Sequence, residues 1–354
     1  MSRADRLEAV LRERELEALI VTNLVNVRYL TGYTGTNGAC IVGAGRRVFL
    51  TDFRYVTQAA REVDGFDREQ GRQDLLEDAA AHLSGRVGFE DFSMTVRQYE
   101  RLRGFASDGT ELVPAGRLVE ALRAVKDDRE LDAIRAAAAL ADEVLAIVPE
   151  RGLAGRTERE VALELEDEMR RRGSDPSFPS IVAGGPNGAL PHARPGAGPI
   201  ARDTLVVVDL GCVVDGYASD CTRTFATGSI PEAAADVYDV VLETQVASLD
   251  EVRAGAPCSE VDAFARERIT AAGHGEEFGH GLGHGIGREI HELPTMRKTG
   301  GEEELRPGMI VTVEPGIYIP GEGGVRIEDD VLITHSGCEV LTSLDKTFEG
   351  CHLE

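Results

Sequence analysis

Apolar runs in the last 150 residues of the chain end repeatedly at an acidic residue. An apolar run over residues 205–208 ends at Asp209, and a β-branched run over residues 310–313 ends at Glu314. Glu328 stands between two further apolar segments. Short runs of this kind predict buried strands. A bare carboxylate buried there would cost several kcal/mol unless a cation or strong donors compensated it. The pattern therefore predicts acidic side chains that gather around bound cations.

The segment that follows the first of these runs predicts a β-hairpin. Two strand-like stretches meet at Asp215-Gly216, which is a strong two-residue turn signal. In the register that this turn sets, Asp209 faces Thr222, and Asp220 is a diagonal neighbour of Asp209 on the same face. Diagonal neighbours lie ~7–8 Å apart at their Cα atoms. The two carboxylates are therefore predicted to bracket a metal site.

The pattern also predicts two domains. Helical and strand-like segments alternate over residues 1–122, as expected of a small α/β domain. A long helical stretch then begins and is broken near Lys126. We therefore expect a first domain of residues 1–122 and a second of residues 123–354.

Two helix starts in the second domain carry recognisable signals. Thr157 and Glu160 have the spacing of a capping box. A further helix is predicted over residues 257–272, with Ser259 as its cap. The strands that carry the acidic residues are interleaved with such helices.

Composition and charge narrow the class of protein. The chain has 354 residues, is 42% hydrophobic and has a net charge of −24. The hydrophobic content excludes a disordered chain, and the negative charge argues against nucleic acid or an anionic membrane as a partner. No run approaches ~20 apolar residues and the start has no signal-peptide core, so we expect a cytoplasmic protein. The six cysteines lack CxxC spacing, which excludes zinc-finger and redox motifs and favours free thiols.

A glycine-rich segment contains several of the eight histidines. Glycine occupies every second position over residues 279–287, so a stable helix is excluded there. One interpretation is a flexible loop with surface histidines. The other is a backbone packed closely against a site, with imidazoles that point inward. The clustering of His280, His284 and His291 in this short segment favours the second interpretation.

Four strings in the second domain resemble a known enzyme family. They are VDLGCVVDGYASDCTRTF, GHGLGHGIGREIHE, TVEPGIY and GGVRIED, and NVRYLTGYTGTNGACIV in the first domain fits the same pattern. Together they look like the metal-dependent Xaa-Pro peptidases, prolidases and aminopeptidases P, of metallopeptidase family M24. The resemblance covers nearly the whole chain. It implies an α/β N-terminal domain followed by an α+β pita-bread catalytic domain.

The resemblance implies a dinuclear metal site with five ligands. Asp209 would hold one ion, His284 and Glu314 the other, and Asp220 and Glu328 would be shared. Four carboxylates and one imidazole favour Mn²⁺, with Co²⁺ or Zn²⁺ as possible occupants. Two such ions lie ~3.5–4 Å apart and lower the pKa of a water that they share.

By the same resemblance, other residues take part in catalysis and substrate binding. Glu314 would also act as a proton shuttle, and His192 and His291 would polarise the scissile carbonyl. His280 would line the pocket for proline. Thr222 and Arg326 would hold the ligand carboxylates in place by hydrogen bonds.

One departure from the family pattern concerns substrate length. Prolidases commonly carry an arginine directly after the proline of HExP, where it binds the substrate's carboxylate, and Thr295 stands there in this chain. Either Arg288 or Arg297 replaces it, or the enzyme is an aminopeptidase P that acts on longer peptides. The short chain favours an Xaa-Pro dipeptidase, whereas Thr295 weakens that choice. We expect the dipeptidase, with the aminopeptidase P as the alternative.

Two other classes are compatible with the same fold. A creatinase-like amidine hydrolase lacks the metal ligands, and the complete ligand set also argues against a purely binding protein. The glycine-rich loop at residues 32–38 is a polar tip on a domain without other chemistry. It suggests a homodimer in which this loop helps to close the partner's active site.

Overall fold

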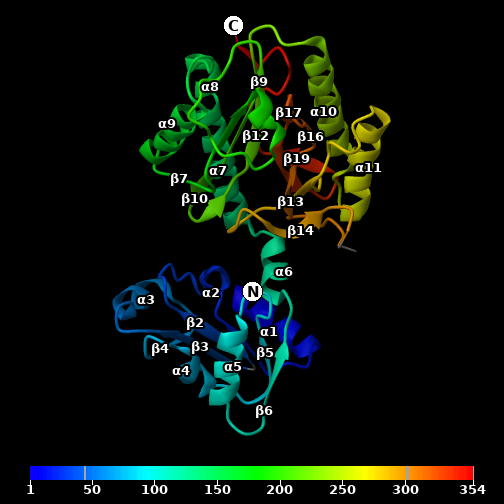
Figure 1. The fold of residues 1–354 in the computed structure, drawn as a ribbon. Helices are drawn as coiled ribbons and strands as arrows, with labels where there is room; N and C mark the ends of the chain where they lie inside the picture. Colours follow the sequence, from blue (N-terminus) through cyan, green and yellow to red (C-terminus); the bar gives the residue numbers. More distant parts are fainter. Residues whose placement is uncertain (44, 300–302, 354) are drawn as a thin grey trace. The chain divides into compact units, whose positions relative to one another are not determined.

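The computed structural model describes residues 1–43, 45–299 and 303–353. The chain forms two compact units, Met1–Arg123 and Ala124–Glu354, which are shown as ribbons in Figure 1.

The first unit is built around a six-stranded mixed sheet with the strand order β4-β3-β2-β1-β5-β6. β1 pairs antiparallel with β2 and parallel with β5, so the sheet changes direction near its centre. The elements follow in the order α1 (Arg3–Glu13), β1 (Ala18–Val21), α2 (Leu24–Thr31), β2 (Ala39–Gly43), β3 (Arg46–Thr51), α3 (Val56–Glu62), β4 (Asp67–Gln70), α4 (Leu76–Ala80), β5 (Gly85–Phe89), α5 (Val96–Phe105), β6 (Thr110–Pro114) and α6 (Leu118–Ala124).

Helices cover both faces of this sheet because its residues alternate between two hydrophobic cores. Cys40 and Val42 of β2 pack with residues of α1 and α2. Ala39 and Ile41 of the same strand pack with residues of α4 and α5. This period of two is what a strand buried on both faces requires. The first unit is thus an α/β domain, as the sequence pattern predicts.

The glycine-rich loop at residues 32–38 is tied to the body of the first unit. Thr34 donates to Glu62 from its backbone N–H and from its hydroxyl, at 2.8 and 2.9 Å. The Asn37 side chain donates to Asp52. The loop therefore has a defined conformation in the described chain.

Strands lie in the interior of the second unit, with helices α7, α8 and α9 on one side and α10 and α11 on the other (Figure 1). The helices are α7 (Asp128–Leu145), α8 (Ile147–Arg151), α9 (Glu158–Arg171), η1 (Gly185–Ala189), α10 (Glu232–Glu251) and α11 (Cys258–Ala271). The strands are β7 (Asp175–Pro176), β8 (Ile181–Gly184), β9 (Leu205–Leu210), β10 (Cys212–Val214), β11 (Tyr217–Ala218), β12 (Cys221–Thr227), β13 (Gly283–Gly285), β14 (Glu292–Met296), β15 (Ile310–Val313), β16 (Gly316–Ile319), β17 (Gly323–Arg326), β18 (Asp329–Ile333), β19 (Cys338–Val340) and β20 (His352–Leu353).

Two sheets in this unit carry the acidic strand ends. One has the order β20-β12-β9-β8 and the other has the order β14-β13-β15-β18-β19. A single large hydrophobic core connects these strands with α7, α9, α10 and α11. Burial of the apolar strand residues in this core brings the acidic residues at their ends into the interior of the unit.

The predicted hairpin register is confirmed. Asp209 of β9 lies opposite Thr222 of β12, and Val214 lies opposite Tyr217. Asp215 and Gly216 have φ values of 52° and 77°. Positive φ at both central residues is the signature of a two-residue type I′ turn. The turn therefore fixes which residues share a face with Asp209.

Of the two predicted helix caps, one is confirmed and one is wrong. The Thr157 side chain accepts from the Glu160 backbone, and Glu160 closes the capping box in return. The helix α11 starts at Cys258, so Ser259 lies inside its first turn, and Pro257 occupies the cap position without a side-chain hydrogen bond. The backbone carbonyl of Glu303 accepts from the Cys258 N–H at 2.9 Å, which satisfies the first amide of this helix.

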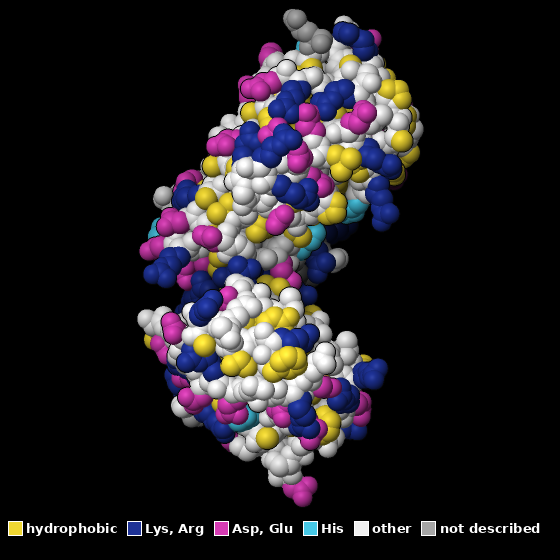
Figure 2. Space-filling model, turned by 90° about the vertical axis from the view of Figure 1, so that its left-hand side faces the viewer, with side chains coloured by type: hydrophobic (Ala, Val, Ile, Leu, Met, Phe, Trp, Pro, Cys, Tyr) yellow, Lys and Arg dark blue, Asp and Glu magenta, His cyan; other side chains and the backbone are white. Residues whose placement is uncertain are grey.

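Surface charges on the α8 and α9 side of the second unit are interspersed rather than gathered by sign (Figure 2). Arg151 pairs with Glu164 and Glu168, and Arg156 also pairs with Glu164. Local pairs of this kind leave no extended basic field on this face. In the described ranges, no helix is long and apolar enough to span a bilayer.

Candidate metal centre and active site

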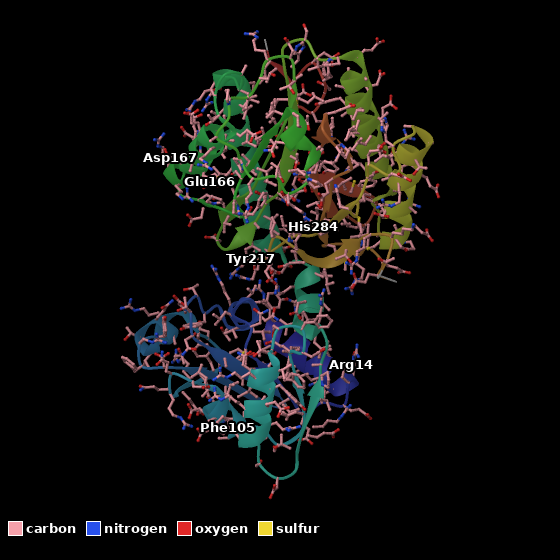
Figure 3. The ribbon with its side chains drawn as sticks, viewed as in Figure 1. Arg14, Phe105, Glu166, Asp167, Tyr217 and His284 are labelled. Atoms are coloured by element: carbon pink, nitrogen blue, oxygen red, sulfur yellow. The ribbon has the colours of Figure 1, made fainter. Side chains whose placement is uncertain are left out.

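All five predicted metal ligands line one cavity of about 480 Å³ in the second unit. Asp209 lies within β9, Asp220 directly before β12 and His284 in the middle of β13. Glu314 directly follows β15, and Glu328 directly precedes β18. Figure 3 labels His284 in the lower part of the second unit, among its strands. Residues up to 119 positions apart in the sequence thus reach one site.

Pairing between β15 and β18 explains why Glu314 and Glu328 meet. Val313 lies opposite Asp329 in this antiparallel pair, so the two glutamates extend from the same end of it. Between the two glutamates in the sequence, the strands β16 and β17 form a hairpin in which Gly316 lies opposite Arg326. This hairpin places Arg326 next to the same end.

Close backbone packing around His284 explains the glycines of its segment. A Cβ atom on Gly283 would lie 2.0 Å from the Thr312 carbonyl oxygen, and one on Gly285 would lie 2.2 Å from that of Leu293. Neither position can hold a side chain at such distances, since β13 lies between β14 and β15. The described structure therefore agrees with a segment packed against a site rather than with a flexible loop.

The His284 ring is oriented with one nitrogen toward the carboxylates. Its Nδ1 lies 3.1 Å from the Gly285 carbonyl oxygen, which can only accept, so Nδ1 carries the proton. Its Nε2 lies 3.4 Å from Glu314 Oε1 and 3.8 Å from Asp220 Oδ2. Ligand atoms of Asp220, His284 and Glu328 all lie within 4.8 Å of one another. The free electron pair of Nε2 is therefore available to a cation at this point.

Burial and mutual repulsion disfavour negative charge on the clustered carboxylates. Burial is the main cause that raises the pKa of Asp220 and Glu328 well above the usual range, and neighbouring carboxylates add to it. Burial likewise raises the pKa of Glu314 to about 8. Burial, then the nearby His291, lowers the pKa of His284 to about 4. An added cation would stabilise the ionised carboxylates and leave the imidazole neutral.

Two residues hold the carboxylates in place, as the family resemblance implies. Arg326 Nη2 donates to Asp209 Oδ2 at 2.6 Å, and its Nε donates to Thr222 Oγ1 at 3.1 Å. The Thr222 hydroxyl in turn donates to Glu328 Oε2 at 2.6 Å. Thr222 and Arg326 are almost completely buried. This series of hydrogen bonds fixes one carboxylate oxygen of Asp209 and one of Glu328.

Tyr318 and Thr312 belong to the site but carry no role in the sequence prediction. The Tyr318 hydroxyl accepts from Arg326 Nη1 at 2.9 Å and lies 2.9 Å from His280 Nε2. His280 Nδ1 faces the Gly281 carbonyl oxygen at 2.8 Å, so Nδ1 is the protonated nitrogen and Nε2 accepts from Tyr318. Burial lowers the pKa of His280 to about 4, which keeps the ring neutral. The Thr312 hydroxyl donates to Glu314 Oε1 at 3.2 Å.

The cavity contains the remaining predicted histidines and one of the two predicted arginines. His192, His280, His291 and Arg297 line it. The His291 ring lies 4.3 Å from that of His284, in an edge-on arrangement. Arg288 does not line the cavity, because its guanidinium stacks on the Tyr217 ring at 4.4 Å. The structure therefore argues against Arg288 as a substrate ligand.

Other residues of the cavity wall were not singled out from the sequence. Phe178, Pro179 and Ile181 provide an apolar part of the wall, and Arg194 provides a further cation. The sequence contains a signal for Arg194 as a residue of the site, since it lies two residues after the predicted catalytic residue His192. No pattern in the segment of Phe178 and Pro179 distinguishes it from an ordinary loop.

Comparisons with known proteins agree with this geometry. Residues 132–335 match the model of metallopeptidase family M24, and residues 3–125 match that of the creatinase/prolidase N-terminal domain. The chain belongs to metallopeptidase family M24. Its M24 region contains all five candidate ligands.

Three relatives illustrate how far the likeness extends. The chain is 38% identical to the uncharacterised peptidase YqhT of Bacillus subtilis, over 97% of this chain and 98% of the relative. It is 34% identical to the Xaa-Pro dipeptidase of Pyrococcus furiosus, over 97% and 98% of the two chains. A solved structure of Xaa-Pro dipeptidase from Bacillus anthracis matches with a TM-score of 0.94 and 38% identity and covers 99% of each chain. The likeness includes both units of this M24 peptidase.

An M24 metallopeptidase requires divalent metal, and the donor atoms of this cavity fit one. Asp209 Oδ1, Asp220 Oδ1 and Glu328 Oε1 are buried and have no hydrogen-bond partner among the described residues. Buried acceptors without partners are costly, and a cation satisfies several at once. Carboxylate oxygens with one imidazole nitrogen suit hard or borderline divalent ions. The set therefore fits a metal centre rather than an ordinary polar core.

Proposed function

We propose that the protein is an Xaa-Pro dipeptidase with two divalent metal ions, Mn²⁺ foremost. The observation that carries the proposal is the convergence of five candidate ligands and three histidines on one cavity. The names of the relatives from Pyrococcus furiosus and Bacillus anthracis support the substrate class. Oxygen-rich ligand sets favour Mn²⁺ over thiolate-preferring ions.

In this proposal the five ligands divide between two ions. Asp209 would hold one, His284 and Glu314 would hold the other, and Asp220 and Glu328 would be shared. When bound, such ions polarise a carbonyl oxygen and make a water nucleophilic near neutral pH. The three carboxylate oxygens without partners, on Asp209, Asp220 and Glu328, support this assignment.

The chain's own residues would move the proton and orient the substrate. The Glu314 carboxylate would accept a proton from the attacking water and deliver it to the leaving proline nitrogen. His192 and His291 would donate hydrogen bonds to the scissile carbonyl oxygen as charge develops on it, and one such donor is worth about 3 kcal/mol. His280, kept neutral by burial and hydrogen-bonded to Tyr318, would line the proline pocket. The apolar side chains of the wall suit a pyrrolidine ring.

The expected assembly remains a prediction. We propose a homodimer, in which the loop at residues 32–38 reaches the partner's active site. Its hydrogen bonds to Glu62 and Asp52 support a loop that holds its shape.

Hydrolysis of defined peptides tests the proposed function. Purified protein loaded with Mn²⁺ should hydrolyse Xaa-Pro dipeptides, with kcat/KM at least ~10-fold higher than for Xaa-Pro-Xaa tripeptides or Xaa-Ala dipeptides, a difference of about 1.4 kcal/mol. The measurement is the release of free proline. A preference for tripeptides would establish the aminopeptidase alternative, and no cleavage of any Xaa-Pro bond would refute the proposal.

A further inference from the structure

Three arginines line the cavity, and their surroundings differ. Arg326 is buried and forms an ion pair with Asp209. Arg194 and Arg297 are exposed at the cavity wall. No carboxylate in the part of the chain that the structure describes forms an ion pair with either of them.

The backbone that carries Arg194 is anchored on both sides. Glu158, a buried residue at the start of α9, accepts from the Gly184 and Gly196 N–H groups, both at 2.7 Å. It also accepts from Asn187 Nδ2 at 2.8 Å. The same Asn187 amide lies 3.4 Å from the Arg194 carbonyl oxygen. One buried carboxylate therefore holds both ends of the segment from 184 to 196.

The middle of this segment is fixed to the metal-ligand network. The Pro191 carbonyl oxygen accepts from Arg326 Nη1 at 3.2 Å. A Cβ atom on Gly188 would lie 3.3 Å from the Gly324 backbone nitrogen, so the segment also packs on the β16–β17 hairpin. His192 and Arg194 thus project from a backbone whose position relative to the candidate ligands is set.

A dipeptide substrate creates a need for such a cation. Its free carboxylate lies one residue beyond the scissile bond and loses bulk water when it enters the cavity. The bound ions would balance the four ligand carboxylates, so the substrate's own charge is costly to bury unless a further cation pairs with it. Thr295, at the position where prolidases carry an arginine, supplies no charge. A guanidinium meets a carboxylate with two parallel hydrogen bonds, which a lysine cannot do.

We infer that Arg194 recognises the free carboxylate of the dipeptide and so sets the preference for dipeptides. The inference rests on the proposed function and names a residue for its substrate specificity. Arg297, directly after β14, lines the same cavity and acts beside Arg194. The backbone of Arg194 lies between two anchors on Glu158, so this backbone loses little freedom when the substrate binds.

Kinetics on a charged and a neutral substrate test the role of Arg194. The substrates are an Xaa-Pro dipeptide with a free carboxylate and the same dipeptide as its C-terminal amide. Arg194→Gln should raise KM for the acid by about 10- to 100-fold with little change in kcat, since it removes one charge-assisted contact. It should change KM for the amide by less than about 2-fold. Arg194→Lys should recover part of the loss on the acid.

A matched control comes from the same region of the chain. Arg202 is exposed and does not line the cavity, so Arg202→Gln should leave both substrates unaffected. An equal change on acid and amide in Arg194→Gln, or no change on the acid, would overturn the inference while the proposed function stands. Failure of the unmodified protein to cleave any Xaa-Pro dipeptide would instead overturn the proposed function, and the inference with it.

Discussion

Replacing Glu328 with Gln should lower peptidase activity on the order of 10³-fold, because a metal ion stabilises the transition state by several kcal/mol. Glu328 would be shared by both ions, so its amide variant should bind fewer ions per chain. The Thr222 hydroxyl can still donate to the amide oxygen, which preserves the local packing. Elemental analysis and peptide hydrolysis measure the two effects.

The same substitution should have the opposite effect on the stability of the metal-free protein. Burial and the neighbouring Glu314 and Asp209 disfavour a charge on Glu328. Without metal, Glu328→Gln should therefore unfold at the same temperature as the unmodified protein or at a higher one, and it should gain less from added Mn²⁺. Glu322→Gln, in the exposed turn of the β16–β17 hairpin, is the matched control and should behave like the unmodified protein. Full metal content and turnover in Glu328→Gln would show that Glu328 is not a ligand.

Removal of metal from the unmodified protein should abolish activity and lower stability together. After treatment with a chelator and its removal, we expect almost no hydrolysis of Xaa-Pro peptides, with recovery best in Mn²⁺ or Co²⁺. A ligand at 100 times its Kd stabilises a folded protein by about 2.7 kcal/mol, so the thermal midpoint should rise with added metal. The rate of peptide hydrolysis and the thermal midpoint, each measured over a metal titration, test the two expectations. Undiminished turnover in metal-free protein would contradict a metallopeptidase mechanism.

The sequence predicts most of the site where local geometry controls the outcome. The Asp215-Gly216 turn sets the register of its hairpin, and the period of two in a strand then places Thr222 opposite Asp209. Apolar strands that end in carboxylates predict that Glu314 and Glu328 are buried or half-buried near other acids, since the runs beside them must enter the core. The pita-bread fold of the second domain and the division of roles among the site residues are implied by the family resemblance instead.

The sequence predicts less where a tertiary contact decides. Arg288 is near His291 in the chain, but β13 shifts register between His284 and Gly285, and the arginine stacks on Tyr217. The link from Arg326 through Tyr318 to His280 joins three elements and has no sequence signal of its own.

The position of Arg194 shows the same limit. It depends on Glu158, a glutamate in the first turn of α9 that resembles any helix-capping acid until its partners are seen. Such long-range hydrogen bonds depend on tertiary packing, and the pattern of apolar and polar residues along the sequence does not predict them.

Anomalous diffraction from crystals loaded with Mn²⁺ would locate the ions of the proposed dinuclear site. Data collected above and below the manganese absorption edge give the position of each ion independently of any activity. We expect two peaks about 3.5–4 Å apart, one next to Asp209 and the other next to His284 and Glu314, with Asp220 and Glu328 contacting both. No peak in this cavity, or ions held by residues outside the set of five, would contradict this expectation.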